Sequence, residues 1–334
     1  MTWWQALIAA GAIPAAYAPP LGGGSIRDEV EGGERADLVE ENELQTHPIP
    51  EPRIPHPVSF LNGMQRWSVV AYDGVAQIVN AYVAAAVCRR DDRGVLHATL
   101  ERTRAFAIAP LDRVSPTLRP LLEQAAPDIE PIDGELVGQP ARYLEQVEST
   151  VRRARTHLER ELAEAATAAL GPAEWLVLDG LLSRSPAVAR HPRALGVVKS
   201  HGAQFLEGRG LERALTLPAG YRTSVFAVRG GHTRTEVYSW YLRLWPWEGN
   251  DLQYGLLRVE ARAHPETVAR ASAISAWLTT ERAPLATPDR RWDRLLYPIH
   301  DVETYLRTRA PRDLVSHPAS RIPHPGSRLP RTGS

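Results

Sequence analysis

The sequence contains very little of two residue types that mark particular classes of protein. Its 334 residues include one cysteine, Cys88, and one lysine, Lys199. A single cysteine cannot form an intrachain disulfide, so we expect a reducing, cytoplasmic environment and a thiol buried as a small apolar side chain. The basic residues are otherwise arginines, which makes Lys199 conspicuous.

Net charge and long apolar runs are also lacking. The chain carries 39 basic and 39 acidic side chains, so it has no global field to attract nucleic acid, and any basic surface must be local. No uninterrupted apolar stretch is long enough to span a membrane. Residues 3–18 are apolar and end in a signal-like Ala-Tyr-Ala, but no basic residue precedes Arg27 and Pro14 interrupts the run. A short docking helix therefore fits better than a secretory signal.

Two catalytic signatures are missing from the chain. There is no Gly-Lys-Ser or Gly-Lys-Thr phosphate loop, so any ATP-driven step needs a partner. There is no Gly-x-Ser-x-Gly elbow, which leaves little support for a serine hydrolase. With 43% apolar residues, the chain can nevertheless bury a sizeable core.

Composition divides the chain into three parts. Residues 19–57 mix proline, glycine and acidic side chains, so residues 1–57 together are predicted to form an N-terminal arm and linker. Residues 58–310 carry the regular apolar patterns of a folded domain, and residues 311–334, rich in proline, arginine and serine, predict a disordered tail.

The folded part opens with several strand-like runs and one long helix. Asp73-Gly74 is a strong hairpin dipeptide, and a three- and four-residue apolar spacing ends at Gly171-Pro172. The expected strands are 58–61, 67–72, 75–87, 175–178, 195–198, 224–228, 238–244 and 254–259; the expected helices are 141–170, 205–214, 265–278 and 292–307. Residues 99–137 look like surface connections, with a strand at 105–108. The order predicts an α/β fold with a mixed sheet, in which the first three strands are antiparallel and a helical crossover leads to a later strand.

This β-β-β-α-β order, with acidic residues on the helix and the fourth strand, is the layout of ribonuclease H-like nucleases. The apolar run 175–178 stops at Asp179-Gly180, which places a carboxylate at a sheet edge. Carboxylates that converge there bind divalent ions that activate water. On the helix, Glu159 and Glu161 lie about 200 degrees apart, so they cannot both face the sheet. We favour Glu159 as the ligand, with Glu161 second, because Leu158 and Leu162 are expected to pack inward.

The first strand departs from this layout. Where a carboxylate is expected the chain has Asn62, whose neutral amide oxygen can coordinate Mg²⁺ or Mn²⁺ without supplying charge. Asp73 is the nearest carboxylate, but its Asp-Gly context favours a structural turn.

Five segments together resemble the NurA nuclease family. They are F-L-N-G at 60–63, V-L-D-G at 177–180, G-V-V-K-S at 196–200, W-Y-L-R-L at 240–244 and G-L-L-R-V-E at 255–260. The resemblance covers roughly residues 58–310. It implies a Mn²⁺-dependent, ribonuclease H-like DNA nuclease, a 5′-to-3′ exonuclease and single-strand endonuclease that works as a homodimer with the hexameric HerA translocase. DNA end processing and phage defence are both possible settings.

The family carries Asp where this chain has Asn62. This difference is either a natural loss or an introduced substitution, and the intact surroundings favour the second. The family's C-terminal Tyr and His correspond to Tyr297 and His300, although the His follows sooner than in the family. His300 could ligate metal or move a proton, or else His300 and Asp301 could cap a helix.

Other residues could contact the substrate. Lys199, after a strand, is a candidate phosphate contact or charge-stabilising cation, with a solvated surface lysine as the alternative. Trp240 belongs to an aromatic cluster that could stack on bases, although such clusters are more often core or interface. Arg243 and Arg258 could line a DNA channel or pair with Glu260. A competing hypothesis is a non-catalytic module that keeps the fold and the translocase interface, which Asn62 favours.

Overall fold

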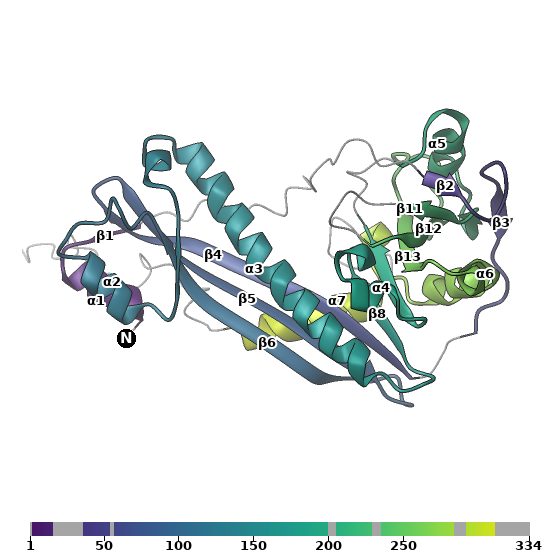
Figure 1. Ribbon diagram of the computed structural model, residues 1–334, viewed down its shortest axis with the longest axis horizontal. Helices are drawn as coiled ribbons and strands as arrows, with labels where there is room; N and C mark the ends of the chain where they lie inside the picture. Colours follow the sequence, from purple (N-terminus) through teal and green to yellow (C-terminus); the bar gives the residue numbers. More distant parts are fainter. Residues whose placement is uncertain are drawn as a thin grey trace, which may run out of the picture.

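The computed structural model describes residues 2–15, 36–53, 57–199, 205–228, 235–283 and 292–310. It is a mixed α/β structure built on one large, mostly antiparallel sheet flanked by helices, as the sequence predicts at this level. Figure 1 shows three long strands and the helix α3 (Pro140–Ala169) running together along the molecule, with most of the shorter strands gathered at one end. No helix within the described ranges is long and apolar enough to cross a membrane.

Three long strands precede α3, and they differ from the three that the sequence analysis predicts there. They are β4 (Val58–Asp73), β5 (Ala76–Arg90) and β6 (Leu96–Ala109). The expected separation of 58–61 from 67–72 is wrong, since β4 pairs with β5 through 62–66 as well. The assignment of 99–137 to surface connections is also wrong. Many β6 side chains between Leu96 and Ala105 are exposed and polar, which hides the apolar alternation that marks a strand.

Two further elements occupy the rest of that segment. They are the helix α2 (Arg119–Ala125) and the strand β7 (Ile129–Pro131), which pairs in parallel with β6. The long helix predicted for 141–170 is confirmed as α3, which begins at Pro140, a favourable first position because proline lacks the N–H that would be unpaired there.

The chain returns from α3 to the middle of the sheet. There β8 (Trp175–Asp179) lies parallel to β4, with Leu61 opposite Leu178, and β9 (Ala194–Val198) lies parallel to β8. The strand order across this region is β6-β5-β4-β8-β9. The sequence-based expectation that the fourth strand lies beside the first is therefore confirmed.

Beyond β9 the sheet continues with antiparallel strands. These are β13 (Leu256–Arg262), β12 (Val237–Arg243), β11 (Phe226–Val228) and β10 (Tyr221–Thr223). The helices of this half are α5 (Gly208–Leu215), α6 (Pro265–Thr280) and α7 (Tyr297–Arg309). The helix predicted for 292–307 begins later, because Trp292–Arg294 form a separate 3₁₀ turn, η3, ahead of Pro298.

Part of the expected N-terminal linker belongs to the folded structure. The helix α1 (Trp3–Ala9) packs beside α2, and β1 (Ile13–Pro14) pairs with the far end of β4. The strands β2 (Ala36–Leu38) and β3 (Thr46–Pro48) pair with β11 and β10. An acidic residue of this segment pairs with the folded domain: Glu40 forms a bidentate ion pair with the buried Arg222 at 2.7 and 2.8 Å. The tail expected after residue 310 lies outside the described residues.

The two faces of the central sheet are covered by different helices. On one face, Leu61 and Leu178 pack with Leu158 and Leu162 of α3. On the other face, Phe60 and Val177 pack with residues of α6 and α7. Because side chains alternate along a strand, this division decides which face each candidate site residue belongs to.

Candidate functional site

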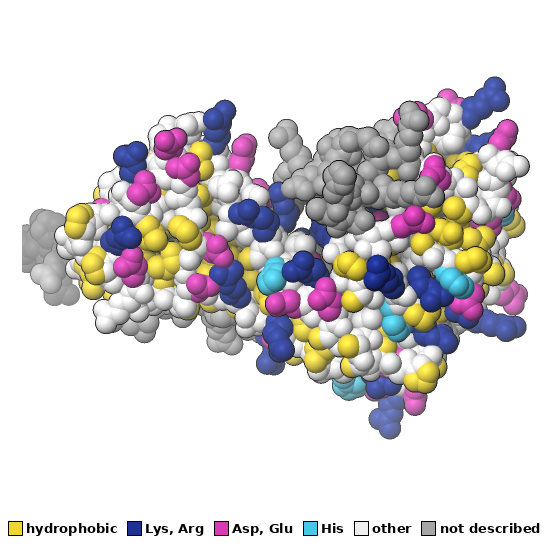
Figure 2. Space-filling model, viewed as in Figure 1, with side chains coloured by type: hydrophobic (Ala, Val, Ile, Leu, Met, Phe, Trp, Pro, Cys, Tyr) yellow, Lys and Arg dark blue, Asp and Glu magenta, His cyan; other side chains and the backbone are white. Residues whose placement is uncertain are grey.

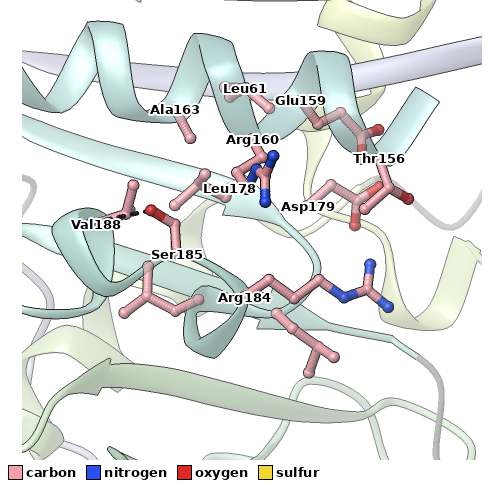
Figure 3. Close-up of a pocket in the computed structure, with 12 residues that line it drawn as sticks. Leu61, Thr156, Glu159, Arg160, Ala163, Leu178, Asp179, Arg184, Ser185 and Val188 are labelled. Carbon is pink, nitrogen blue, oxygen red and sulfur yellow. Dashed lines mark hydrogen bonds between the residues drawn. The ribbon is translucent and has the colours of Figure 1, made fainter. Parts of the chain in front are cut away.

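A pocket lies where the carboxyl end of β8 meets α3. Its third wall is the turn after β8, formed by the 3₁₀ segment η2 (Leu182–Arg184) and the short helix α4 (Pro186–Ala189). One end of the pocket is apolar and the other is charged, as Figure 3 shows. The lining residues are Leu61, Thr156, Glu159, Arg160, Ala163, Leu178, Asp179, Leu181, Leu182, Arg184, Ser185 and Val188.

Glu159 reaches from α3 down to the backbone of β4. A Cβ atom added to Gly63 would overlap the Oε1 atom of Glu159 and lie 2.9 Å from its Cγ and Cδ atoms. Gly63 is therefore needed because the Glu159 side chain occupies the space above it. This contact explains why the F-L-N-G segment ends in glycine, and it fixes the Glu159 side chain beside the sheet.

The environment of Glu159 favours its protonated form. Its side chain is only 16% exposed, and this burial raises the pKa of its carboxyl group, with a further increase from the nearby charge of Asp179. Arg155, 3.5 Å away, opposes the increase, as do Arg184 and Lys199. Two carboxylates in one pocket repel each other, so a bound cation would stabilise both in their charged forms.

Asp179 ends β8 and is held by Lys199. The Nζ atom of Lys199 lies 2.8 Å from Oδ2 of Asp179, and the two side chains are 8% and 21% exposed. The next residue, Gly180, has φ +121, and its N–H donates to the carbonyl of Val197 on β9. Lys199 is thus an ion-paired residue at the pocket, not the solvated surface lysine of the alternative interpretation.

The other carboxylates of α3 lie elsewhere. Glu161 is exposed and faces His157 at 3.2 Å, whereas Glu164 accepts a 2.8 Å hydrogen bond from the hydroxyl of Ser185. The preference for Glu159 over Glu161 therefore agrees with the geometry.

Asn62 does not join Glu159 at the pocket. Its Nδ2 donates to the carbonyl of Ile299 in α7 at 3.1 Å, and its Oδ1 accepts from the N–H of Gly63 at 2.8 Å. The side chain therefore lies on the α7 face of β4, while Glu159 covers the α3 face. Asn62 and Glu159 therefore lie on opposite faces of β4, because neighbouring positions on a strand point to opposite faces. A metal shared by Asn62, Glu159 and Asp179 stays a prediction.

Tyr297 and His300 lie on the same far face as Asn62. Tyr297 is the first residue of α7 and is 48% exposed, and the Nε2 atom of His300 lies 3.4 Å from the hydroxyl of Thr304. Neither residue lines the pocket. The capping alternative is also wrong, since the N-cap of α7 is Leu296 and no side chain caps it.

Trp240 and Arg243 are structural. Trp240 is fully buried and its indole N–H donates to Ser275 at 2.9 Å, so its ring is not available for stacking on bases. Arg243 is also fully buried, and its guanidinium donates to four backbone carbonyls. The proposed roles of both residues in binding DNA are therefore corrected.

Arg258 is buried and pairs with Glu260 at 2.7 Å, which is the alternative that the sequence left open, so it does not line a DNA channel. The other oxygen of Glu260 accepts from the backbone N–H groups of Leu182 and Ser183 at 2.8 and 3.2 Å. This carboxylate thus anchors the turn that forms the third wall of the pocket.

The sequence analysis missed Arg160 and Arg184, both of which line the pocket. Arg160 lies one residue from Glu159, but Arg184 belongs to a polar loop whose position depends on Glu260, almost eighty residues away in sequence. Only the periodicity of α3 could have placed Arg160, and no local pattern could have placed Arg184.

Two carboxylates of the pocket could hold a divalent cation. Glu159 and Asp179 supply hard carboxylate oxygens, and Mg²⁺-type ions are commonly held by one or two carboxylates together with substrate phosphates. Among the residues that the structure describes, no cluster of three or more His, Cys, Asp or Glu is placed to hold a metal. Glu159 and Asp179 are the two acidic residues among those that line the pocket.

Comparison with known proteins gives no further guidance. No protein-family model matches the chain, and no curated protein matches it.

Proposed function

We propose that this chain is a metal-dependent DNA nuclease with a ribonuclease H-like fold. The observation that carries the proposal is the meeting of Glu159 and Asp179 in one pocket at the carboxyl end of β8. The strand order β6-β5-β4-β8-β9, antiparallel over the first three strands and parallel over the last three, supports the fold assignment. The resemblance of five short segments to NurA nucleases supports the same reaction class.

The roles of the protein residues follow from their positions. A bound Mn²⁺ or Mg²⁺ ion would polarise a phosphoryl oxygen and lower the pKa of water. Glu159 and Asp179 would hold that ion, Glu159 after losing the proton that burial favours. Lys199 neutralises Asp179 and supplies a fixed positive charge beside the reacting phosphate.

The partners belong to the same proposal. A cytoplasmic complex of a homodimer with a HerA-type hexameric ATPase, acting on DNA ends, is the setting that the resemblance suggests. Figure 2 shows basic and acidic side chains interspersed over the face that carries α3, so DNA would be attracted by local basic groups and not by a field of one sign.

A cleavage assay tests the nuclease proposal. End-labelled linear DNA is incubated with Mn²⁺ and the wild-type chain, the Asp179→Ala variant or the Glu159→Gln variant, each with and without the cognate ATPase. Both substitutions should lower the rate by at least about a hundredfold, because each removes a charged ligand. Cleavage that is equal in all three samples would overturn the site.

Asn62 favours a second candidate function, a non-catalytic module that binds DNA or the translocase. Its amide donates to the Ile299 carbonyl, which a carboxylate at this position could not do. The Asn62→Asp variant separates the candidates. Cleavage by this variant and not by the wild type would identify Asn62 as an inactivating residue. Cleavage by the wild type would support the site formed by Glu159 and Asp179. Absence of cleavage by both proteins with the ATPase present would favour the non-catalytic module.

A further inference from the structure

The turn after β8 is held by side-chain hydrogen bonds at several points. The backbone N–H groups of Leu182 and Ser183 donate to Glu260, whose own charge is balanced by the buried Arg258. On the other side of the turn, the hydroxyl of Ser185 donates to Glu164. Burying an ion pair has a large desolvation cost, so its use here to fix one short turn calls for an explanation.

The turn presents one side chain to the pocket. Ser183 and Ser185 are buried, while Arg184 between them is exposed and lines the pocket. Figure 3 shows Arg184 extending along the floor of the pocket toward the end that holds Asp179. Arg184 makes no hydrogen bond or salt bridge with any residue in the described ranges, whereas Arg160 contacts His157 and Arg155 contacts Glu159.

The charge of the pocket suits an anion. Glu159 and Asp179 are the two acidic lining residues, and Arg160 and Arg184 are the two basic ones. Lys199 pairs with Asp179 and Arg155 with Glu159, so four cationic groups surround two carboxylates. An arginine held in place with its donors unused matches the geometry of a phosphate group, which accepts two parallel N–H bonds.

We propose that Arg184 is the phosphate-binding residue of this pocket, that its ligand is a phosphodiester group of a single DNA strand, and that Glu164 and Glu260 are positioning residues for it. The proposal rests on the proposed nuclease function and names how that site binds its substrate. It predicts that strand binding needs Arg184 even where no metal is present and no bond is cleaved.

Binding in EDTA tests this without cleavage. The full-length chain is titrated into fluorescein-labelled oligothymidylate at several salt concentrations, and the anisotropy gives Kd. Arg184→Gln should weaken binding about tenfold and lower the slope of log Kd against log salt by about 0.7, the value for one lost contact to a single strand. The matched control is Arg190→Gln, which changes an exposed arginine at the end of α4, outside the pocket lining, and should change Kd less than about twofold.

Two results would overturn the proposal. One is an Arg184→Gln variant with the affinity and salt slope of the wild type; the other is a wild type that does not bind the oligonucleotide in EDTA. Inorganic phosphate at matched ionic strength serves as a competitor, and displacement at concentrations near the Kd of the oligonucleotide would show that free phosphate, not a strand, is the ligand. A failed cleavage assay with intact, Arg184-dependent binding would instead reject the nuclease alone.

A double-mutant cycle tests the positioning role. Glu164→Ala removes the acceptor of the Ser185 hydroxyl and should weaken oligonucleotide binding about threefold when Arg184 is present. In the Arg184→Gln background the same change should have no further effect, because its action runs through Arg184. An equal loss in both backgrounds would show that Glu164 does not position Arg184.

Discussion

The ammonium group of Lys199 lies 2.8 Å from Oδ2 of Asp179 and joins the ends of two parallel strands that are twenty residues apart in sequence. The lysine side chain is 8% exposed, so this pair is poorly screened by solvent. The ammonium group of Lys199 therefore donates a hydrogen bond to one of the two carboxylate oxygens with which Asp179 would coordinate a divalent cation. A metal ion that binds Asp179 must compete with the ammonium group of Lys199 for this carboxylate.

Replacing Lys199 should separate metal binding from cleavage. In Lys199→Met, Asp179 has no competing cation, so Mn²⁺ should bind about tenfold more tightly by calorimetry. Cleavage should nevertheless fall by about tenfold or more, because the fixed charge beside the phosphate is lost. Lys199→Arg keeps the charge and should stay near the wild type in affinity. Equal Mn²⁺ affinity in all three proteins would show that Lys199 does not compete for Asp179.

The raised pKa of Glu159 predicts a specific dependence of stability on pH. Burial raises the pKa of its carboxyl group above the ordinary value of 4.5, so the folded chain holds a proton that the unfolded chain has released. The free energy of unfolding should therefore fall as the pH rises from about 4.5 through the raised value. Urea unfolding in EDTA over this pH range measures the fall.

A variant without this titration provides the comparison. In Glu159→Gln the fall in stability should be smaller than in the wild type, since the amide does not ionise. Mn²⁺ should also restore stability at the upper end of the range in the wild type and not in the variant. Identical pH profiles for the two proteins would show that the pKa of Glu159 is not raised.

Gly63 and Glu159 should be coupled through their contact. In Gly63→Ala the new Cβ meets the Glu159 carboxylate, so we expect a loss of about 1–3 kcal/mol in the free energy of unfolding, together with weaker Mn²⁺ binding. Adding Glu159→Ala removes the overlap and should recover most of that stability. Gly138→Ala is the control, because a Cβ there meets nothing within 4 Å. Additive losses in the double variant would argue against the contact.

Local sequence patterns predicted much of the fold and two residues that the structure brings to one pocket. The Asp-Gly hairpin, the spacing along α3 and the buried run ending at Asp179 each depend on neighbours within one element, and all three appear as expected. Glu159 and Asp179 could be paired because a helix face and a strand end are readable from sequence. The boundaries of β4 and β6 could not be predicted from sequence. Their polar residues pair with neighbouring strands or lie exposed, and both depend on segments distant in the chain.

The missed and misplaced residues share one physical cause. Asn62 and Gly63 are adjacent, yet they face different helices, and only the packing of α3 and α7 shows which side each one takes. Arg184 depends on Glu260 in the same way. Arg243 alternates with apolar neighbours as an exposed strand residue would, but both faces of β12 are covered, so Arg243 and Trp240 are buried.

Arg243 provides the clearest test of a structural role against a DNA-binding one. Its guanidinium donates to the backbone carbonyls of Leu215, Leu217, Leu252 and Tyr254, and no carboxylate contacts it in the part of the chain that the structure describes. Burial lowers the pKa of this guanidinium to about 10. The residue thus holds three segments of the chain together through charge-assisted hydrogen bonds.

Arg243→Met would leave these carbonyls unpaired in the interior. We expect a loss of at least about 3 kcal/mol in the free energy of unfolding by urea, because each buried acceptor left without a donor is penalised. Oligonucleotide affinity per folded molecule should be unchanged, since the side chain does not reach solvent. Arg190→Met, at an exposed arginine, should leave stability within about 0.5 kcal/mol of the wild type. If Arg243→Met kept its stability and lost its affinity for DNA, the structural role would be wrong and Arg243 would be a DNA-binding residue.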